Sequence, residues 1–587
     1  MRYALRPIIA GMQKREVKMY ATIDIETTGL NRFKDKVTWV GIGISKNVNC
    51  DFIKEYYLDM RDDKDLDKFK SVCNKLREHK VKTVFQNGKF DTLFIETAYD
   101  ITIPIHEDVM LMGTAYDLAA EHGLKDMAQR YLGVPDWDIS KKEKLSGNDS
   151  IIPYLKCDVL YTWELFKYFK EQMSSQQEKI YKKILRPAYL MYRDTERNGA
   201  YIDVPKLREV REEYKQREKE KLDWLNNKYP INWNSSAQVA DVLFSEDKEG
   251  CPVLKKSVKT NKPSADAEVL NKLAAKGYEI PKVLLEYKAV NTLSKMFLNR
   301  WEDDLGFDKR LHPSFNLTNV VTGRTSCQNP NLQQVPREKA VRSLFNAPKG
   351  RLFFEADYSQ LELRIAAEYS HDPVMLDIYK NGGDIHTTTA KLMTGGREPT
   401  KQERSRAKAV NFGFLYGMLA KKFVDYAYNS YGVVFSQREA ELFREAFFAK
   451  YARLLPWHKE MEYECELMGG VANKFGRFRK LPNIYSQDRF ERLSAVRRAI
   501  NTPVQGTGSD LLISAATKIN HDLKKEGVKI VGTVHDSILG EFRAEDRDWV
   551  VEYIRKVMLH PPILDDFGVT LEVPLDIDIG VGPWGTH

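Results

Sequence analysis

Three short stretches near the start of the sequence carry carboxylates at spacings that suit a cation site. In ATIDIETTGL, Asp24 and Glu26 are two residues apart on a predicted strand, so both side chains point to the same face. QNGKFD ends in Asp91, while Tyr154 and Asp158 in YLKCD are four apart and share one face of a predicted helix. Adjacent like charges are costly unless a cation binds them, which indicates a metal site, with an exposed strand edge as the alternative.

Two later stretches each deliver one carboxylate to the end of an apolar, β-rich run. In RLFFEADYSQLELRIAAEY, the strand pattern ends at Asp357 and a helical period with Glu362 follows. An Asp at such a junction is most often the N-cap of the helix. In KIVGTVHDSILGEF, two β-rich runs flank Asp536. Asp536 could therefore be a turn residue, or it could be half of a metal site whose other half is distant in sequence.

A regular stripe of cations and aromatic rings occupies KQERSRAKAVNFGFLYGM. Arg404, Lys408, Phe412 and Tyr416 recur every four residues, and each step turns about 40° around a helix, so all four share one face. Cations suit a triphosphate, and rings suit a sugar and bases. Taken alone, a basic amphipathic helix is more often a solvated surface.

The order DxE, NxxxD and YxxxD resembles the 3′-5′ proofreading exonuclease of the DNA polymerase I family, over about residues 20–172. The resemblance implies that Asp24, Glu26, Asp91 and Asp158 bind two divalent ions and that Tyr154 orients the attacking water. Two such ions would activate that water and stabilise the leaving 3′ oxygen. Ligands that are all oxygen suit Mg²⁺, with Mn²⁺ as a substitute, rather than zinc.

The two later acidic stretches resemble the palm motifs of the same family. By this resemblance Asp357 and Asp536 bind the two catalytic ions of a polymerase site, and Tyr358 contributes its backbone carbonyl. Asp536 is then interpreted as a metal ligand and not as a turn residue. Glu362 would crowd the 2′ position of the sugar, so that ribonucleotides are rejected by sterics.

Ser537 departs from the family pattern. The third palm motif is normally His-Asp-Glu, whereas this chain has His535-Asp536-Ser537. A hydroxyl cannot supply charge to the site. Two carboxylates still suffice because phosphates and water complete the shells, so we expect activity with a changed metal preference or a weaker grip near the primer end. Glu541 on the returning strand could compensate in part.

The stripe resembles the fingers helix of this family, R-x3-K-x3-F-x3-Y-G. The resemblance implies that its two cations bind the incoming phosphates, that Phe412 packs on the sugar, and that Tyr416 occupies the templating-base position while the site is open. It also assigns His386 and Gln360 to the nucleotide. The DNA contacts that it implies are Arg324, Asn331, Arg497, Asn501, Gln505, His535, Lys255, Lys256 and Lys259. The last three lie in a Lys-rich loop that, judged on its own, could equally be a solvated surface.

The secondary-structure pattern predicts an α/β multidomain protein. Strand-like and helical runs alternate early, long helices follow, and a helical block from about 384 to 468 interrupts a second β-rich region. With the resemblance, this predicts a ribonuclease H-like 3′-5′ exonuclease domain followed by a right-hand polymerase of palm, fingers and thumb. The expected boundaries are an N-terminal extension at 1–19, exonuclease at 20–172, connecting helices and thumb at 173–305, palm at 306–380 and 496–587, and fingers at 381–495.

The composition excludes several other classes of protein. The 587 residues are 42% hydrophobic and 30% charged, as in globular proteins of several modules, and 91 basic against 83 acidic residues give a modest net charge of +8. Six scattered cysteines without a CxxC pair argue against a disulfide framework or a structural zinc site and predict a reducing compartment. No apolar run approaches the ~18 residues that span a bilayer, so no membrane partner is expected.

The sequence thus predicts a template-directed DNA polymerase with proofreading that binds primer-template DNA, dNTPs and two Mg²⁺ ions per active site. We expect a monomer without a 5′ nuclease domain and without the thumb insertion that recruits a processivity partner. The expected location is the cytoplasm of a bacterial or virus-infected cell, with an organelle left open by the basic N-terminus. The alternatives are an exonuclease, or a nucleic-acid-binding protein, with an inactive polymerase half.

Phe412 predicts how such a polymerase treats chain terminators. Some family members have tyrosine at this position, and by the resemblance phenylalanine implies poor use of dideoxynucleotides. We expect the wild-type enzyme to prefer dNTPs strongly over ddNTPs in a single-nucleotide extension assay. Termination by ddNTPs near parity with dNTP incorporation would contradict this assignment.

Overall fold

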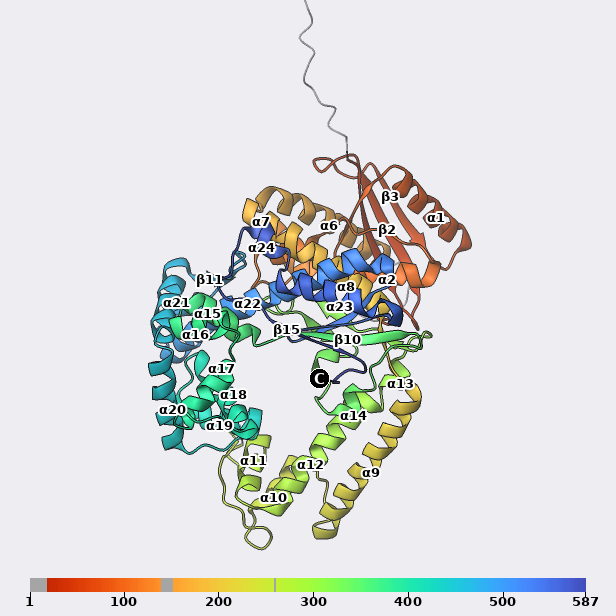
Figure 1. Cartoon of the computed structure of the whole chain (residues 1–587). Coiled ribbons are helices and arrows are strands. Elements are labelled where there is room, and N and C mark those ends of the chain that lie inside the picture. The colour runs from red at the N-terminus through yellow and green to blue at the C-terminus, as the bar shows by residue number, and fades with distance from the viewer. Residues whose placement is uncertain (1–17, 139–150, 258–259, 587) are drawn as a thin grey trace, which may run out of the picture. The chain divides into compact units, whose positions relative to one another are not determined.

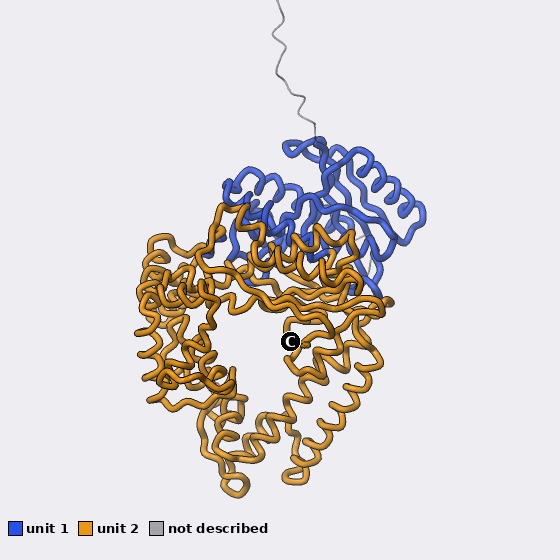
Figure 2. Tube along the Cα trace, viewed as in Figure 1, with its two compact units in different colours: residues 1–193, 317–321, 476–479 blue, residues 194–316, 322–475, 480–587 orange. Residues whose placement is uncertain are grey.

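The computed structural model describes residues 18–138, 151–257 and 260–586, and its chain divides into two compact units (Figure 2). The first unit comprises residues 1–193, 317–321 and 476–479. The second comprises residues 194–316, 322–475 and 480–587. Most of the predicted N-terminal extension and Lys259 lie outside the described residues.

The first unit is built on a mixed five-stranded sheet in the order β3-β2-β1-β4-β5. The strands are β1 (Tyr20–Thr27), β2 (Val37–Ser45), β3 (Lys54–Asp59), β4 (Lys82–Phe85) and β5 (Glu107–Asp108). The central strand β1 is antiparallel to β2 and parallel to β4. The buried residues of β1 include Ala21, Ile23 and Ile25. An apolar core therefore holds the strand that carries Asp24 and Glu26.

Figure 1 shows the helices of the first unit, of which those at residues 63–78, 88–99 and 152–172 pack against this sheet. They are α1 (Asp63–Glu78), α2 (Gly88–Tyr99), α3 (Val109–Tyr116), α4 (Leu124–Leu132), α6 (Ile152–Gln172), α7 (Ser175–Ile180), the π-helical turn η2 (Tyr181–Leu185) and α8 (Arg186–Asn198), within which the chain passes to the second unit.

Helix α6 approaches the sheet closely because β2 has a glycine beneath it. A Cβ added to Gly41 would lie 2.7 Å from Val159 Cγ2 and 3.0 Å from Leu155 Cγ, which is closer than carbon atoms pack. Leu155 and Val159 are fully buried in a cluster with Trp39. The close approach allows the polar face of α6 to reach the end of β1.

The second unit contains an antiparallel sheet in the order β13-β14-β10-β15. Its strands are β10 (Arg351–Tyr358), β13 (Lys529–Val534), β14 (Ser537–Arg543) and β15 (Ile577–Val581). Helices α22 (Arg489–Leu523) and α23 (Arg547–Leu559) pack against it (Figure 1). The register places Asp357 on β10 directly opposite Ser537 on β14.

A two-residue turn, His535-Asp536, joins β13 to β14. His535 has a φ of 54°, the left-handed region that such tight turns require. The prediction that Asp536 is not a turn residue is therefore wrong. The turn itself sets Asp536 beside the end of β10, because the Tyr358 amide donates to the Asp536 carbonyl at 3.2 Å.

The second unit contains many further helices (Figure 1). They are α9 (Val204–Lys228), α10 (Ser236–Phe244), α11 (Ala267–Ala275), α12 (Glu279–Leu293), η3 (Ser294–Leu298), α13 (Trp301–Asp304), η4 (Leu332–Gln334), α14 (Lys339–Arg342), α15 (Leu361–Ser370), α16 (Pro373–Lys380), α17 (Ile385–Met393), α18 (Lys401–Leu415), α19 (Ala420–Tyr431), α20 (Gln437–Lys450), α21 (Leu454–Met468), η5 (Pro482–Tyr485), η6 (Lys524–Glu526), η7 (Ala544–Asp546) and α24 (Ile563–Phe567). Short strands of this unit are β6 (Ala200–Tyr201), β7 (Arg310–Leu311), β8 (Ser314–Asn316), β9 (Ser326–Gln328) and β11 (Gly470–Ala472), while most of β12 (Phe478–Lys480) belongs to the first unit.

Two further expectations concern bilayers and disulfides. Among the described residues, no helix is long and apolar enough to cross a bilayer. All six cysteines lie within the described ranges, and no disulfide joins any of them.

Gly540 tests the packing of the second sheet. A Cβ at this position would lie 2.4 Å from Phe354 Cε1 and 2.7 Å from the Lys529 carbonyl oxygen. Because the backbone cannot yield cheaply, we expect Gly540→Ala to destabilise the protein by about 1 to 3 kcal/mol in thermal unfolding. The matched control is Gly532→Ala on β13, whose Cβ would meet only Phe315 Cζ at 3.4 Å. Equal melting temperatures for the two variants would contradict the register of β14.

Candidate active sites

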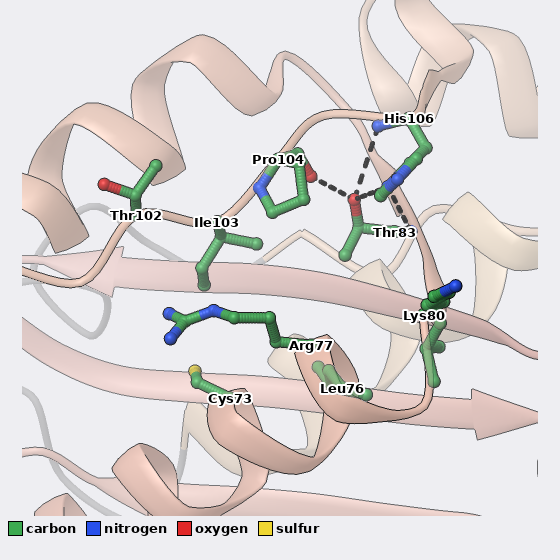
Figure 3. Close-up of a pocket in the computed structure, with 10 residues that line it drawn as sticks. Cys73, Leu76, Arg77, Lys80, Thr83, Thr102, Ile103, Pro104 and His106 are labelled. Carbon is green, nitrogen blue, oxygen red and sulfur yellow. Dashed lines mark hydrogen bonds between the residues drawn. The ribbon is translucent and has the colours of Figure 1, made fainter.

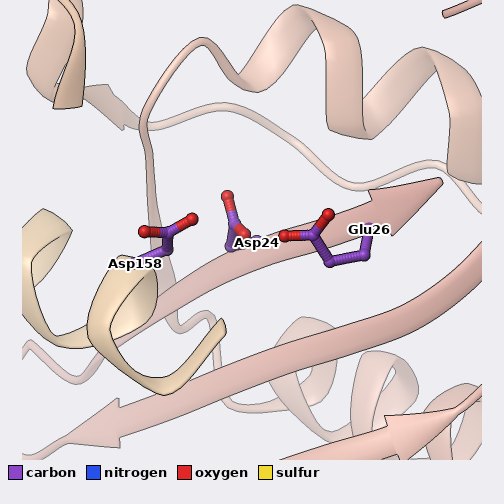
Figure 4. Close-up of side chains that lie close together, drawn as sticks. All are labelled: Asp24, Glu26 and Asp158. Atoms are coloured by element: carbon purple, nitrogen blue, oxygen red, sulfur yellow. The ribbon is translucent and has the colours of Figure 1, made fainter. Parts of the chain in front are cut away.

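The first candidate site is a cluster of three acids in the first unit (Figure 4). Asp24 and Glu26 come from β1, and Asp158 comes from α6. One carboxylate oxygen from each lies within 4.8 Å of the others, which is close enough for all three to hold one cation. The predicted pairing of the DxE strand with the YxxxD helix is thus present in the structure.

Asp91 lies next to this cluster and is anchored by the backbone of β1. Its Oδ1 accepts a hydrogen bond of 3.1 Å from the amide of Ile25, between the two acids of the strand. Burial raises the pKa of Asp24 well above its usual range, and the charges of Asp158, Asp91 and Glu26 raise it further. A bound cation would therefore stabilise the charged form of these carboxylates. The possible ligand atoms are all carboxylate oxygens, which suit Mg²⁺ or Mn²⁺.

Two contacts at this site were not foreseen from the sequence. Trp137 Nε1 donates to Asp158 Oδ1 at 2.6 Å, which fixes the orientation of that carboxylate. The Lys125 ammonium lies 3.3 Å from the hydroxyl of Tyr154 and 4.7 Å from the centre of its ring. Burial, followed by the charges of Asp158 and Glu26, raises the pKa of Tyr154, so its hydroxyl stays protonated and can donate. Neither Trp137 nor Lys125 belongs to a periodic motif that could have revealed it.

The first unit also contains a cavity of about 380 Å³ that holds none of the predicted site residues (Figure 3). It is lined by Cys73, Leu76, Arg77, Lys80, Val81, Thr83, Thr102, Ile103, Pro104 and His106. The Thr83 hydroxyl donates to the Pro104 carbonyl and lies 3.1 Å from His106 Nδ1. This lining has no carboxylate, so the cavity does not offer the donors of a divalent-ion site.

The second candidate site lies where β10 ends beside the β13-β14 turn. Asp357 is the last residue but one of β10, and the Ser537 hydroxyl donates to its Oδ1 at 2.8 Å. Burial raises the pKa of Asp536 to about 7, Glu362 and Asp357 raise it too, and Arg324 opposes them. The charge of Asp357 thus acts on Asp536, as expected of two ligands that share a cation.

Glu541 takes no part in this second site. It is fully buried, and both of its oxygens accept from Arg310 Nη2, at 2.8 and 3.1 Å. Arg351 Nε donates to it at 2.9 Å. Withdrawing the acid would leave the buried guanidinium of Arg310 and the half-buried one of Arg351 without it, which is strongly destabilising. The expectation that Glu541 could compensate for the missing acid is therefore wrong.

The stripe of cations and rings lies along α18, which begins with a capping box formed by Thr400 and Glu403. Arg404 Nε donates to Asp384 Oδ2 at 2.6 Å, and Asp384 Oδ1 caps α17 by accepting from the His386 amide. Burial alone would raise the pKa of Asp384, but hydrogen bonds from Arg404 and Thr387 lower it to about 2. Arg404 thus already pairs with an anion where a phosphate is expected.

His386 is held in one protonation state beside the stripe. Burial lowers its pKa to about 4, and Lys408 and Arg404 add to this against the opposing effect of Asp384. The ring is therefore neutral at pH 7. Its Nδ1 lies 2.8 Å from the amide nitrogen of Asn411 and accepts from it, which leaves the proton on Nε2 as a donor. The ring also packs on Phe412, with 5.8 Å between centroids.

Tyr416 ends α18 and is tied to α15. Its hydroxyl donates to Glu362 Oε2 at 3.1 Å, and the Arg324 guanidinium forms an ion pair with the same carboxylate. Gln360, at the start of α15, accepts from Tyr379 at 3.4 Å. Arg324, Glu362 and Tyr416, which were predicted to contact DNA, the sugar and the templating-base position, thus belong to one hydrogen-bonded set.

The other predicted DNA contacts are spread over the second unit. Arg497 is exposed, and Asn501 and Gln505 are half-buried, along one face of α22. The Asn331 side chain caps its own short helix by accepting from the Gln333 amide. In the Lys-rich loop, Lys256 is exposed.

Neighbouring charges act on two of the predicted DNA contacts, Lys255 and His535. Lys255 forms ion pairs with Asp266 at 2.8 Å and Glu268 at 2.7 Å. Burial lowers the pKa of His535, and the charges of Arg337, Arg324 and Arg342 lower it further. Neither Arg337 nor Arg342 was among the site residues predicted from the sequence.

Comparisons with known proteins give the same picture. A family model described as DNA polymerase family A matches residues 205–586, and one described as a 3′-5′ exonuclease matches residues 8–174. DNA polymerase I of Pseudomonas aeruginosa is 29% identical over 613 residues, which cover 98% of this chain and 64% of that protein. This chain thus spans less than two thirds of that relative.

Two other matches cover both partners almost fully. DNA polymerase I of Aquifex aeolicus is 29% identical over 598 residues, or 97% of this chain and 96% of that protein. A solved structure, the POL domain of Pol1 from M. smegmatis in complex with DNA primer-template and dNTP, superposes with a TM-score of 0.81. It covers 97% of this chain and 95% of the other at 22% identity, and so shows a common fold. The predicted fold class is confirmed.

Asp536 makes the stability of the metal-free protein depend on pH. Its pKa is about 7 in the folded state and 3.8 in the unfolded state, so stability is lost as pH rises from about 4 to 7. In EDTA at pH 8, we expect Asp536→Asn to raise the free energy of unfolding by about 1 to 3 kcal/mol, measured as a higher melting temperature. At pH 4 we expect little change. The exposed Asp247→Asn is the control, and an equal effect of both changes at pH 8 would contradict the burial of Asp536.

Proposed function

The chain belongs to DNA polymerase family A, and from this we propose that it extends primers on a DNA template with dNTPs and removes mismatched 3′ ends with its exonuclease domain. One observation carries the proposal most directly. The β10-β14 register brings the end of β10 and the β13-β14 turn together, so that Asp357 and Asp536 act on one another although they are far apart in the sequence.

Both reactions are phosphoryl transfers at carboxylate sites. Divalent ions bound there, which we propose to be two Mg²⁺ per site, would activate the attacking oxygen and stabilise the leaving oxygen. Asp357 and Asp536 would hold them in the polymerase site, together with the Tyr358 carbonyl. Asp24, Glu26, Asp158 and Asp91 would hold them in the exonuclease site. The protein otherwise contributes positioning and electrostatics.

The nucleotide-binding residues act in the protonation states described above. Arg404 and Lys408 would bind the triphosphate, with Arg404 exchanging Asp384 for a phosphate oxygen. Neutral His386 would donate its Nε2 proton to a phosphate oxygen, since its Nδ1 is occupied by Asn411. Phe412 would pack against the sugar.

For a nucleotide to pair with the template, Tyr416 would have to move out of the position that the templating base takes. That requires Tyr416 to release Glu362, which then lies beside the sugar and excludes a 2′ hydroxyl. Closure of α18 would complete the site only when a correct pair fits. Gln360 lies next to Glu362 and would contact the same nucleotide.

The exonuclease uses its own set of positioning groups. The protonated Tyr154 hydroxyl would orient the attacking water, and Trp137 holds the Asp158 carboxylate for this reaction. Lys125 stabilises the Tyr154 ring through its cation.

The duplex would be held by contacts that do not read sequence. Arg497, Asn501 and Gln505 on α22 can face minor-groove acceptors that all base pairs share, and His535, Arg324 and Asn331 would contact the primer-template near the site. Lys255, Lys256 and Lys259 would bind backbone phosphates, and Lys255 must first leave its two acids. We place the exonuclease at 20–172, connecting helices and thumb at 173–305, palm at 306–380 and 496–587, and fingers at 381–495, in a chain that acts as a monomer.

The alternatives differ in which half is active. A nuclease or a nucleic-acid-binding protein with an inactive polymerase half would be expected to have lost carboxylates from the palm. Both Asp357 and Asp536 are present and act on one another electrostatically, which favours an active polymerase. The six cysteines without disulfides favour a reducing compartment such as a cytoplasm.

Two substitutions separate the proposed activities. On a labelled primer-template with Mg²⁺, we expect Asp357→Ala to slow extension by about 10³-fold or more, because a shared ligand worth several kcal/mol is lost. Shortening of the primer without dNTPs is expected to continue. Asp24→Ala is expected to show the reverse pattern.

The exposed Asp247→Ala is the control and should leave both activities unchanged. Wild-type protein that shortens primers but never extends them would establish the nuclease alternative. Protein that binds the primer-template and does neither would establish the binding alternative.

A further inference from the structure

Ser537 lies between two carboxylates of the facing strand. Its hydroxyl is 2.8 Å from Asp357 Oδ1 and 3.4 Å from Glu355 Oε1. Glu355 and Asp357 are two residues apart on β10, so both point to the same face of the sheet, and Ser537 is directly opposite Asp357. A glutamate side chain is long enough to reach a residue placed diagonally across a strand pair. The three side chains therefore form one polar cluster at the end of the sheet.

We propose that Glu355 supplies from β10 the acid that Ser537 does not supply from β14, and so completes the metal site of the polymerase. This inference rests on the proposed polymerase function and adds a residue to its site. Glu355 is a positioning residue: it adds negative charge beside Asp357, and it shares the Ser537 hydroxyl that orients the Asp357 carboxylate. Partners of this kind typically change the affinity of a metal site by about 10- to 100-fold.

Glu355 is held in place well enough for this role. Trp584 Nε1 donates to its Oε1 at 3.0 Å, and Arg342 Nη1 approaches the same oxygen to 3.9 Å. The Arg342 guanidinium also lies over the Trp584 ring, 4.5 Å from its centre. The Glu355 side chain is 12% exposed, so solvent ions screen its charge only weakly. The ion pair with Arg342 offsets part of this charge, but a fixed carboxylate beside Asp357 still favours a cation there.

A purely structural role would use Glu355 only as an acceptor for Trp584. Two conservative variants separate the roles. Glu355→Gln keeps a carbonyl oxygen that can accept from Trp584 and Ser537 but removes the charge. Trp584→Phe removes the donor and keeps the charge. Only the first variant should weaken a metal site, and thermal unfolding of each shows whether its fold is intact.

The test measures Mn²⁺ binding directly by electron paramagnetic resonance. It uses the full chain with a primer-template blocked at its 3′ end and a dNTP, so no turnover is needed, in an Asp24→Asn background that weakens the exonuclease site. We expect Glu355→Gln to raise the dissociation constant for Mn²⁺ about 10- to 100-fold. Trp584→Phe should stay within about twofold of the parent.

Moving the acid between strands gives the sharpest result. Glu355→Ser should lose Mn²⁺ affinity, and adding Ser537→Glu should restore most of it, because the carboxylate returns to the same cluster from the facing strand. Wild-type affinity in Glu355→Gln, an equal loss in Trp584→Phe, or a double variant as weak as Glu355→Ser would each overturn the proposal. If the parent neither extends an unblocked primer nor binds Mn²⁺ in a way that depends on Asp357, the proposed function itself fails.

Discussion

The antiparallel pairing of β10 with β14 is the constraint on which the second unit depends. A slip of one residue would turn every side chain of one strand to the other face, and Asp357 would no longer meet Ser537 or the Asp536 turn. The far end of the same pair resists such a slip. There Glu541 is buried between Arg310 and Arg351, and a displaced Glu541 would be a buried charge without partners. Glu541, which lies outside the candidate site, thus helps to fix the strand register that places Asp357 and Asp536 in it.

In both candidate sites, burial and neighbouring carboxylates disfavour the charged form of an aspartate. Asp24 and Asp536 have raised pKa values mainly because they are buried, and their acidic neighbours add to the effect. Each site joins a strand to a second element: α6 in the first unit and the β13-β14 turn in the second. The cost of assembling like charges is borne by apolar packing elsewhere, as under α6, where Gly41 lets Val159 and the helix approach the sheet.

Periodic features were predictable from the sequence, and contacts between distant segments were not. The shared face of Asp24 and Glu26 and the stripe on α18 follow from the strand and helix periods. The turn at Asp536 was one of two interpretations of the sequence, and it was rejected because the resemblance to a palm motif was taken to exclude it; a tight turn can also present a metal ligand. Trp137 approaches Asp158 from a loop, and Asp384 meets Arg404 across two helices, so only the tertiary structure shows them.

The pairing of Arg404 with Asp384 makes Asp384 an internal counterion. Burial lowers the pKa of Lys408, and the charge of Arg404 lowers it further. The ion pair between Arg404 and Asp384 reduces this repulsion between the two cations. In the proposed function, an incoming triphosphate would replace one anion by another, and much of the charge neutralisation would already be present before it arrives. Counterion release, which makes the binding of DNA phosphates fall steeply with salt, is correspondingly smaller for the nucleotide. The proposed nucleotide binding would therefore persist at ionic strengths that weaken the proposed binding of duplex DNA.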